Sequence, residues 1–362
     1  MSRGSEERAL LAESADQLFA ELAHAERDAD VWQAIEANGM TMLFDPEDEG
    51  GFGGGWEDAF VLLHSAAFHA LRAPLAETLL ARRLARQAQL DVPPGAIAIA
   101  FREGGSARAV CWGNAVDHVA VISEVEGARR LQIVAARHVE IRAVRATIAQ
   151  EPLADLHFDD DAPCESGSID EDPFLAGALM RAASMAGALS ATLDRSVQHA
   201  NDRQQFGRPI GKFQAVQHSL ALLANEVAAV NCAAVAACRA ADRAPAEFAI
   251  AAAKLRANRA AGVATAIAHQ VHGAIGFTME HKLHLATQRL WTWRSEYGND
   301  RYWATRLGDI AAAHGGEGLW RYLTMLTDCV RHPHTCSAPK HLPVVEPLVI
   351  INPCTQPLDQ PR

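Results

Sequence analysis

The sequence has no excess of basic residues. Its 362 residues include 33 Lys and Arg against 44 Asp and Glu, so the formal net charge is −11, and the pI is near 5.8. Proteins that bind nucleic acids or anionic membranes normally carry a net basic surface. We therefore expect neither partner, and an anionic ligand would have to be held by a few local cations.

Cysteine pairs and long apolar runs are missing too. The seven cysteines are an odd number without a CxxC pair, which provides neither a disulfide framework nor a zinc site. No run approaches the roughly 18–20 apolar residues of a membrane span, and the first residues lead into a charged segment instead of an apolar signal core. These absences predict a reduced, cytoplasmic protein without a membrane span.

Tyrosine is scarce, with three residues, whereas alanine, leucine and arginine dominate. This composition favours helices, and an amphipathic helical pattern runs from Glu6 to about Gln89. A loop at 44–58 interrupts it, because a proline and five glycines forbid a continuous helix. Such a loop alone is a weak phosphate signal, so a surface turn is its simplest interpretation. Residues 1–93 are predicted to form an N-terminal helical domain.

The sequence pattern changes over residues 94–166. This segment contains short runs that are rich in Val and Ile and bounded by Gly, Asp and Pro. Such runs indicate antiparallel β-structure, so a small β domain is predicted between helical ones. The runs cover residues 96–101, 109–113, 118–123, 130–136 and 153–161.

A helical period returns over residues 167–331, where apolar residues recur three or four positions apart. This spacing predicts long helices packed as a bundle, and core packing is the expected role of the apolar stripes. The stripes are Met185, Leu189, Leu193 and Val197; Val216, Leu220, Leu223, Val227 and Val230; and Val263, Ile267, Val271 and Ile275.

The proline-rich residues 332–362 are predicted to be a loosely ordered tail. His332, His334 and Cys336 in the tail could chelate a metal, but no second ligand cluster accompanies them, and no metal site is expected.

The stretch NDRQQFGRPIGKFQAVQH at 201–218 interrupts the bundle helices. Gly207, followed closely by a proline, can end a helix, and an αα-hairpin needs nothing more. The guanidinium of Arg203, however, suits a phosphate, and the amide of Gln205 and the ring of Phe206 lie beside it in sequence. A structural turn and a ligand contact both remain open.

A second stretch, HQVHGAIGFTMEHKLHL at 269–285, contains two glycines at the end of a helical pattern. Gly273 and Gly276 allow close backbone approach by a flat or phosphorylated ligand, and Gln270 offers donors one turn earlier. A helix C-cap with a sharp turn would also explain them. Two such stretches on neighbouring bundle helices favour a ligand.

The chain resembles the acyl-CoA dehydrogenase family of flavoproteins over roughly residues 6–330. The likeness rests on the order of helical domain, small β domain and helical bundle, together with PEDEGGFGGG, RQQFGRPIGKFQAVQH and QVHGAIGFTMEH. It implies a mainly α fold with a small inserted β domain, bound FAD, and α,β-dehydrogenation of an acyl-CoA thioester. In that chemistry a glutamate removes the α proton, the β hydrogen leaves as hydride to the flavin, and an electron-transfer flavoprotein reoxidises the cofactor.

The resemblance also implies cofactor contacts. In the family, the two motifs reach across a dimer interface to a flavin that the neighbouring subunit mainly holds. Contacts to the ADP half of FAD fall on Arg203, Gln205 and Phe206, and contacts to its pyrophosphate on Gln270, Gly273 and Ala274; Gln214 is a further cofactor-binding position.

The sequence departs from the family where a subunit contacts its own flavin. The family's T-E-P-x-x-G-S-D-like loop corresponds here to AFREGGSARAV at 100–110. Gly105 and Ser106 resemble a remnant of that loop, but Arg102 replaces a small polar residue and no aspartate follows the serine. The chain's contacts to its own flavin ring are therefore in doubt.

The catalytic base is in doubt as well. One branch of the family has it at the position of Gly177, and the main branch at that of Tyr297. Glu296 precedes Tyr297 by one residue and is the candidate base. The alternative for Glu296 is a solvated carboxylate at a helix end, paired with Arg294 or Arg301.

The residues that would contact a neighbouring subunit's flavin are thus present in the sequence. The residues that would contact the chain's own flavin and substrate differ from the family pattern. This pattern is similar to the partner-type subunits of heterotetrameric acyl-CoA dehydrogenases, several of which act on steroid side-chain CoA esters. A subunit completing another subunit's flavin site is the first hypothesis. A self-sufficient homo-oligomer with Glu296 as base is the second, and a non-catalytic scaffold on the same fold is the third.

Overall fold

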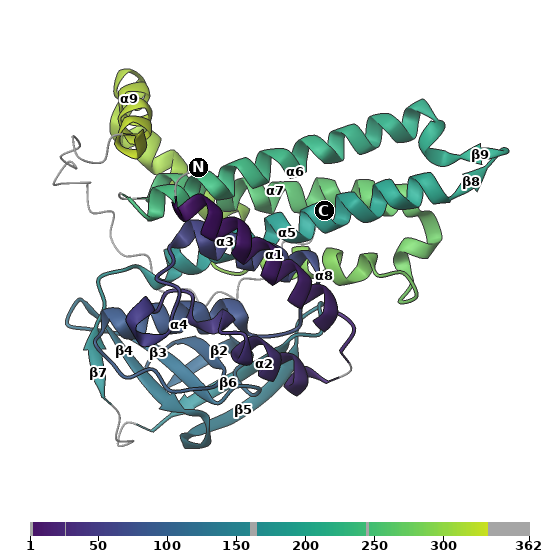
Figure 1. Ribbon diagram of the computed structural model, residues 1–362. Coiled ribbons are helices and arrows are strands. Elements are labelled where there is room, and N and C mark those ends of the chain that lie inside the picture. The colour runs from purple at the N-terminus through teal and green to yellow at the C-terminus, as the bar shows by residue number, and fades with distance from the viewer. Residues whose placement is uncertain (1–2, 26, 160–164, 244–245, 332–362) are drawn as a thin grey trace.

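The computed structural model describes residues 3–25, 27–159, 165–243 and 246–331. A compact β region lies below a set of long helices, and the bundle helices extend well past it on one side (Figure 1). This is the mainly α fold with a small inserted β region that the sequence predicted. The division into domains at residues 93, 166 and 331 remains a prediction, and the tail with His332, His334 and Cys336 lies outside the described residues.

The N-terminal part is helical on both sides of the glycine-rich loop. Its elements are α1 (Arg3–Leu22), α2 (Asp28–Ala37), η1 (Met40–Met42), η2 (Glu47–Glu49), α3 (Trp56–Phe68) and α4 (Leu75–Gln87). The loop is a hydrogen-bonded turn, in which the Gly53 and Gly54 amides donate to the carbonyls of Asp45 and Leu43 over 2.7 and 2.8 Å. A Cβ on Gly51 would lie 2.2 Å from the Asp45 carbonyl oxygen, so glycine permits this close packing.

The strands form two small sheets. They are β1 (Ile97–Phe101), β2 (Ser106–Cys111), β3 (His118–Val125), β4 (Ala128–Ala135), β5 (Val139–Ala146), β6 (Pro152–Phe158) and β7 (Ser166–Ser168), with the 3-10 turn η3 (Ala136–His138). The strand orders are β1-β3-β4-β7 and β2-β6-β5. The sequence analysis missed β5 and β7. It was also wrong to expect only antiparallel pairing, because β1 and β3 are parallel.

The side chains of β1 alternate between two cores and so connect the β region to the helices. Ile97, Ile99 and Phe101 join the core shared with the helices, whereas Ala98 and Ala100 face the smaller core between the two sheets. Successive strand side chains point to opposite faces, so one short strand serves both cores. All five residues are buried.

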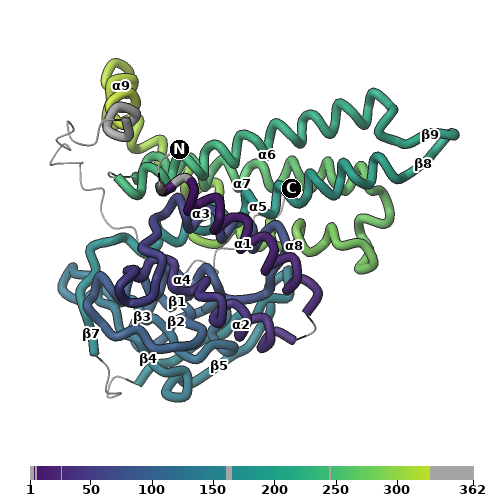
Figure 2. Tube along the Cα trace, in the orientation of Figure 1, coloured from purple at the N-terminus to yellow at the C-terminus, as the bar shows by residue number. Residues whose placement is uncertain are grey.

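The C-terminal part is a bundle of long helices. Its elements are α5 (Pro173–Asp202), β8 (Gln204–Gln205), β9 (Arg208–Pro209), η4 (Ile210–Lys212), α6 (Gln214–Ala241), α7 (Glu247–His272), η5 (Gly273–Phe277), α8 (Leu283–Trp293) and α9 (Asp300–Arg331). The central helix α5 packs against α3, α6, α7 and α8. Its start is well defined, because Asp172 accepts hydrogen bonds from the Phe174 and Leu175 amides and Pro173 occupies the first turn. The tube in Figure 2 shows the β8–β9 turn at the far end of this bundle.

The apolar stripes are only partly core. Met185, Leu189, Leu223, Val227, Val230 and Val271 are buried as expected. The prediction was wrong for Val197, Val263 and Ile275, which are 39%, 45% and 40% exposed. No other described element covers these faces toward the far end of the bundle.

Two of the bundle helices are long and apolar enough to cross a membrane by length and composition alone. The apolar windows of α5 and α6 have mean hydropathies of 1.3 and 1.7, so the expectation that no segment approaches this limit was too simple. The α5 window is 83% buried inside the chain, as in the core helix of a globular domain, but the α6 window is only 28% buried. Most residues of the α6 window are therefore half-buried or exposed.

Candidate functional site

A β-hairpin projects from the far end of α5 (Figure 1). Strands β8 and β9 pair antiparallel, and the two residues at the tip, Phe206 and Gly207, have φ of 53° and 77°. Positive φ at both central residues is what a type I′ hairpin turn requires. The sequence predicted that Gly207 ends the helix within an αα-hairpin, and this was wrong. The helix already ends at Asp202, and the Ile210 amide donates to the Arg203 carbonyl over 2.8 Å and closes the hairpin.

The side chains of the hairpin face outward. Phe206 is 91% exposed, and Arg203, Gln205 and Gln214 are exposed as well. Within the described part of the chain, the Arg203 guanidinium forms no hydrogen bond and no ion pair. An unpaired guanidinium beside an exposed aromatic ring is available to a ligand or to another chain.

The second predicted stretch lies beside an open hollow of about 550 Å³. Helix α7 ends at His272, and Gly273 follows with φ 64° and ψ −143°, a backbone conformation that favours glycine. The hollow is lined by Gly262, Thr265, Ala266, His269, Gln270, Gly273, Ala274, Phe277 and Trp291. The three predicted pyrophosphate contacts Gln270, Gly273 and Ala274 therefore share one concave surface.

Histidine side chains join the two stretches. His199, one turn before Arg203, stacks on His272 with ring centroids 4.5 Å apart, and His281 packs edge-on against both rings. The ends of α5 and α7 therefore lie together at the same end of the bundle. All seven cofactor-binding residues predicted from the sequence gather there, and all are exposed: Arg203, Gln205, Phe206, Gln214, Gln270, Gly273 and Ala274.

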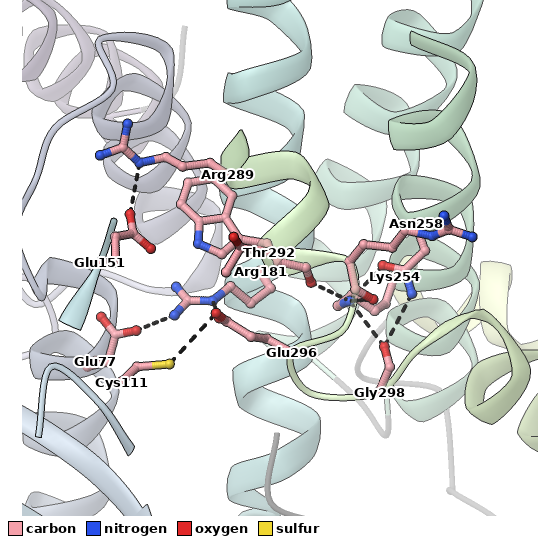
Figure 3. A network of polar contacts seen from close by, with 12 residues as sticks. Glu77, Cys111, Glu151, Arg181, Lys254, Asn258, Arg289, Thr292, Glu296 and Gly298 are labelled. Carbon is pink, nitrogen blue, oxygen red and sulfur yellow. Dashed lines mark hydrogen bonds and ion pairs between the residues drawn. The ribbon is translucent and has the colours of Figure 1, made fainter. Parts of the chain in front are cut away.

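Glu296, the predicted base, lies elsewhere, in a buried ionic network between α4, α5 and the chain after α8 (Figure 3). The Nε of Arg181 donates to Glu296 Oε2 over 2.5 Å, and its Nη2 donates to Glu77. The Cys111 thiol lies 3.7 Å from Glu296 Oε1. The expectation of a solvated Glu296 paired with Arg294 or Arg301 was wrong, because Glu296 is 2% exposed and the guanidinium of Arg181 meets it inside the core.

The network holds opposite charges together inside the core. Burial raises the pKa of Glu296, and the Arg181 guanidinium opposes that rise. Burial would lower the pKa of Arg181, but Glu296 and Glu77 raise it above its usual value. Arg181 therefore stays charged, and the two carboxylates serve as its counter-ions.

A buried lysine fixes the turn that carries Glu296. The Nζ of Lys254 donates to Asn258 Oδ1 over 2.6 Å and to the carbonyls of Trp293 and Gly298 over 3.0 and 3.2 Å. Asn258 also donates to the Gly298 carbonyl (Figure 3). Burial lowers the pKa of Lys254 to about 7. The turn after α8 is thus tied to α7 by several bonds.

The two positions that the resemblance assigned to the family's base, Gly177 and Tyr297, touch each other. A Cβ on Gly177 would lie 2.1 Å from Cε1 of Tyr297, so no side chain fits on Gly177 beside this ring. Tyr297 is 3% exposed and packs against Phe101 and Phe174, with centroid distances of 6.3 and 5.9 Å. An aromatic cluster therefore fills this part of the core.

The cavity beside the network is small. It measures about 40 Å³ and is bounded in part by Glu77, Arg181, Trp112 and Trp293. Pockets that bind small molecules typically measure about 300–1,000 Å³. The hollow at the far end of the bundle falls within this range, and the cavity beside Glu296 does not.

The turn at 100–110 closes on itself. Glu103 and Ser106 pair through their backbones, the Nε of Arg102 donates to the Gly104 carbonyl over 2.7 Å, and the hydroxyl of Ser106 lies 3.1 Å from Nδ1 of His157. The polar groups of this turn thus bond within the chain.

The fold places the chain in a class of mainly helical proteins with an inserted β region. Residues 169–299 match the family described as "Acyl-CoA dehydrogenase, C-terminal domain". The acyl-CoA dehydrogenase IpdE2 of Mycobacterium tuberculosis is 31% identical over 267 residues, which cover 72% of this chain and 80% of the relative. The chain belongs to the acyl-CoA dehydrogenase family, whose members are oxidoreductases that act on acyl-CoA.

Solved structures share the fold. The Tcur3481-Tcur3483 steroid ACAD variant has a TM-score of 0.71 and 23% identity, covering 84% of this chain and 97% of that chain. The ChsE4-ChsE5 complex from Mycobacterium tuberculosis has a TM-score of 0.70 and 20% identity, covering 86% and 98%. The second name describes a complex of ChsE4 with ChsE5, and the first joins the two names Tcur3481 and Tcur3483.

Sequence reasoning missed the buried network and the histidine contacts. A signal for the network is visible: Arg181 is a single charge within the helical run ALMRAASM, and Lys254 directly follows the apolar run AIAAA. A charge at such a position is almost never fully buried unless it is paired. The partners Glu77 and Glu296 are far away in sequence, so only the fold connects them.

Proposed function

We propose that this chain is a subunit of a heteromeric acyl-CoA dehydrogenase and completes the FAD site of a catalytic partner subunit. The outward-facing binding groups carry the proposal. Arg203 and Phe206 are exposed on a projecting hairpin, and Gln270 and Gly273 line an open hollow at the same end of the bundle. Exposed donors and an exposed ring are available to another molecule.

The residues at this end fit the ADP half of FAD in chemistry. Arg203 is an unpaired cation with a planar set of donors, which suits a phosphate. Gln270 adds amide donors, and Gly273 and Ala274 expose backbone at the end of α7. The exposed ring of Phe206 offers an apolar face to a flat group. The net acidic chain thus has local cations and donors where an anionic ligand would need them.

Bound FAD would supply the chemistry by accepting a hydride from the β carbon of an acyl-CoA thioester. The residues of this chain would bind and orient it. Arg203 would donate to a phosphate oxygen, Gln205 and Gln270 would donate amide hydrogen bonds, and Phe206 would exclude water beside them. The proton at the α carbon would be removed by a base in the partner subunit.

The buried residues around Glu296 support the assignment of the catalytic base to the partner subunit. A base must reach the substrate carbon and exchange a proton with it, but Glu296 is 2% exposed and bound to Arg181. Tyr297 and Gly177 are in contact, with no room for a side chain at Gly177. The cavity of about 40 Å³ beside Glu77 and Arg181 is too small for an acyl chain. In this proposal, Glu296 is the counter-ion of Arg181.

The assembly and the substrate belong to the same proposal. The outward apolar surface of α6 suits contact with a homologous bundle, since only 28% of its apolar window is buried within the chain. The names of the neighbours Tcur3481-Tcur3483 and ChsE4-ChsE5 describe two-component proteins, one of them a steroid ACAD. We propose an acyl-CoA ester with a steroid or fatty acyl group as substrate, an electron-transfer flavoprotein as electron acceptor, and a cytoplasmic location.

Co-expression with a homologous catalytic subunit tests the proposal. The chain alone should purify without stoichiometric flavin, and the co-purified complex should bind FAD and be reduced by acyl-CoA, as followed at the flavin absorption band. One FAD per chain in the isolated protein would contradict the partner role. The absence of FAD in both preparations would favour a non-catalytic scaffold.

Glu296→Gln separates the partner role from the self-sufficient enzyme. The variant keeps the shape of the side chain but removes its charge. Flavin reduction by acyl-CoA in the assembled complex should proceed at a rate within about twofold of the native complex. A loss of roughly 100-fold or more, the size expected for removal of a general base, would identify Glu296 as catalytic.

A further inference from the structure

Three histidines from separate segments meet at the junction of the two outward-facing stretches. His199 comes from the last turns of α5, His272 is the last residue of α7, and His281 lies in the loop before α8. Each offers one ring nitrogen, and these three atoms lie within 4.8 Å of one another. We call these residues the histidine cluster.

The central member of the cluster has an unused acceptor. His272 is 6% exposed, and its Nδ1–H donates to the Ala268 carbonyl over 2.7 Å. That bond leaves the lone pair on Nε2, and Nε2 is buried without a hydrogen-bond partner in the described part of the chain. A histidine that ligates a metal typically donates its other ring N–H to a backbone carbonyl in this way, which fixes the tautomer.

We propose that the histidine cluster is a binding site for a transition-metal ion of the Zn²⁺ class. Three imidazoles without a carboxylate suit Zn²⁺, Co²⁺, Ni²⁺ or Cu²⁺ and do not suit Mg²⁺ or Ca²⁺. Three protein ligands leave a fourth tetrahedral position for water or an anion. This site was not foreseen, because its ligands are scattered in sequence with no recognisable metal-binding spacing.

The surroundings of the cluster define what binding requires. A neutral imidazole is the form that ligates metals. The Nδ1 of His281 accepts the Leu283 amide over 3.1 Å. Ligation by either ring nitrogen of His281 therefore requires this residue to give up that hydrogen bond.

A metal here would connect the two outward-facing stretches. The cluster lies one turn before Arg203 on one side and directly before Gly273 on the other. A bound ion would tie the end of α5 to the end of α7 and to the loop before α8. The site is a property of this chain alone and does not depend on flavin or on a partner subunit.

Metal titration of the isolated chain tests the site. The protein would carry His332→Ala, His334→Ala and Cys336→Ser, so that these tail residues cannot contribute ligands. After treatment with EDTA, isothermal titration with Zn²⁺ should give one ion per chain. Co²⁺ should give a visible d–d absorption spectrum, and saturating Zn²⁺ should raise the melting temperature by a few degrees.

Variants of the cluster locate the ion. His199→Ala and His272→Gln should each weaken Zn²⁺ binding by more than about tenfold and abolish the Zn²⁺-induced rise in melting temperature. His269→Ala is the matched control, because His269 lies one turn before His272 on the same helix and outside the cluster. It should bind Zn²⁺ like the parent.

The proposal is overturned if neither Zn²⁺ nor Co²⁺ binds saturably, or if His199→Ala binds both with unchanged affinity. Should His272→Gln fail to fold, the half-buried His199 still decides the outcome. Because the assay uses no flavin and no acyl-CoA, failure of metal binding leaves the proposed FAD role intact. Failure of the FAD role equally leaves the metal site standing.

Discussion

Arg181 and Arg203 stand near opposite ends of the same helix, about 33 Å apart at 1.5 Å per residue. Arg181 is buried and meets two carboxylates, Glu77 and Glu296. Arg203 is exposed, with no ionic partner among the described residues. At one end the chain satisfies its own charges, and at the other it leaves donors available to a different molecule.

The two ends also differ in the space that they leave. A cavity of about 40 Å³ adjoins Arg181, and an open hollow of about 550 Å³ adjoins Gln270 and Gly273. In a buried ion pair the mutual attraction mainly repays the cost of desolvation. Removal of one partner is nonetheless costly, because it leaves an uncompensated charge inside a closed core.

Arg181→Met should have the largest effect, because it leaves Glu77 and Glu296 buried without their cation. Removal of one partner from a buried ion pair costs about 3–5 kcal/mol, and urea unfolding followed by circular dichroism should show this loss. The triple variant that adds Glu77→Gln and Glu296→Gln removes the stranded charges and should recover most of it. A loss below about 1 kcal/mol in the single variant would mean that the core is hydrated and open.

Lys254→Met should have the second largest effect. It removes the donor to Asn258 and to the carbonyls of Trp293 and Gly298, and buried acceptors left unpaired cost about 1–3 kcal/mol each. The total loss in the free energy of unfolding is expected to be about 2–3 kcal/mol, because Asn258 still donates to the Gly298 carbonyl.

The same variant has a pH signature. Burial lowers the pKa of Lys254 to about 7 in the folded chain, whereas an unfolded lysine has a pKa near 10.4. Between these values the unfolded state binds more protons, so the native free energy of unfolding should rise with pH. Urea unfolding at pH 7, 8 and 9 should give a shallower slope for Lys254→Met than for the native chain. Equal slopes would mean that Lys254 keeps its proton when buried.

Sequence patterns predicted the helices and the outward-facing end better than the buried end. The periodic runs gave the correct order of helices, since that signal is local to each helix. Arg203 and Gln270 were identified because turn residues and donors occur together in short stretches. The burial of Glu296 could not be read in this way, since it depends on Arg181, which lies 115 positions away.

The hairpin shows a second limit of sequence reasoning. Gly207 was assigned to a helix stop because glycine after a helical run usually adopts the left-handed C′ position. Gly207 does have a positive φ, but so does Phe206 before it, which makes the pair the centre of a β-turn. A phenylalanine rarely adopts this conformation, so the local sequence gave no reason to expect it.

Arg203→Ala tests the open end and should leave the isolated chain almost unchanged, within about 0.5 kcal/mol. In the assembled complex, loss of a charge-assisted hydrogen bond should weaken FAD binding by about 1.5–3 kcal/mol, measured by flavin release on dilution. Arg208→Ala is the matched control, because Arg208 is exposed on the same hairpin but lies over the Phe213 ring at 4.3 Å. Equal effects of the two variants would assign the role to hairpin charge in general.

Phe206→Asn should have a small effect on the isolated chain, and its sign is informative. Phe206 is 91% exposed with φ 53°, so it buries little surface, and asparagine tolerates this conformation better. The free energy of unfolding should rise by up to about 1 kcal/mol in urea, while FAD retention in the complex should fall because the apolar face is lost. A rise in chain stability together with a fall in flavin binding would show that the strained backbone conformation of Phe206 serves a contact with another molecule. A loss of stability would show instead that the ring, which lies 6.1 Å from Phe213, serves the fold of its own hairpin.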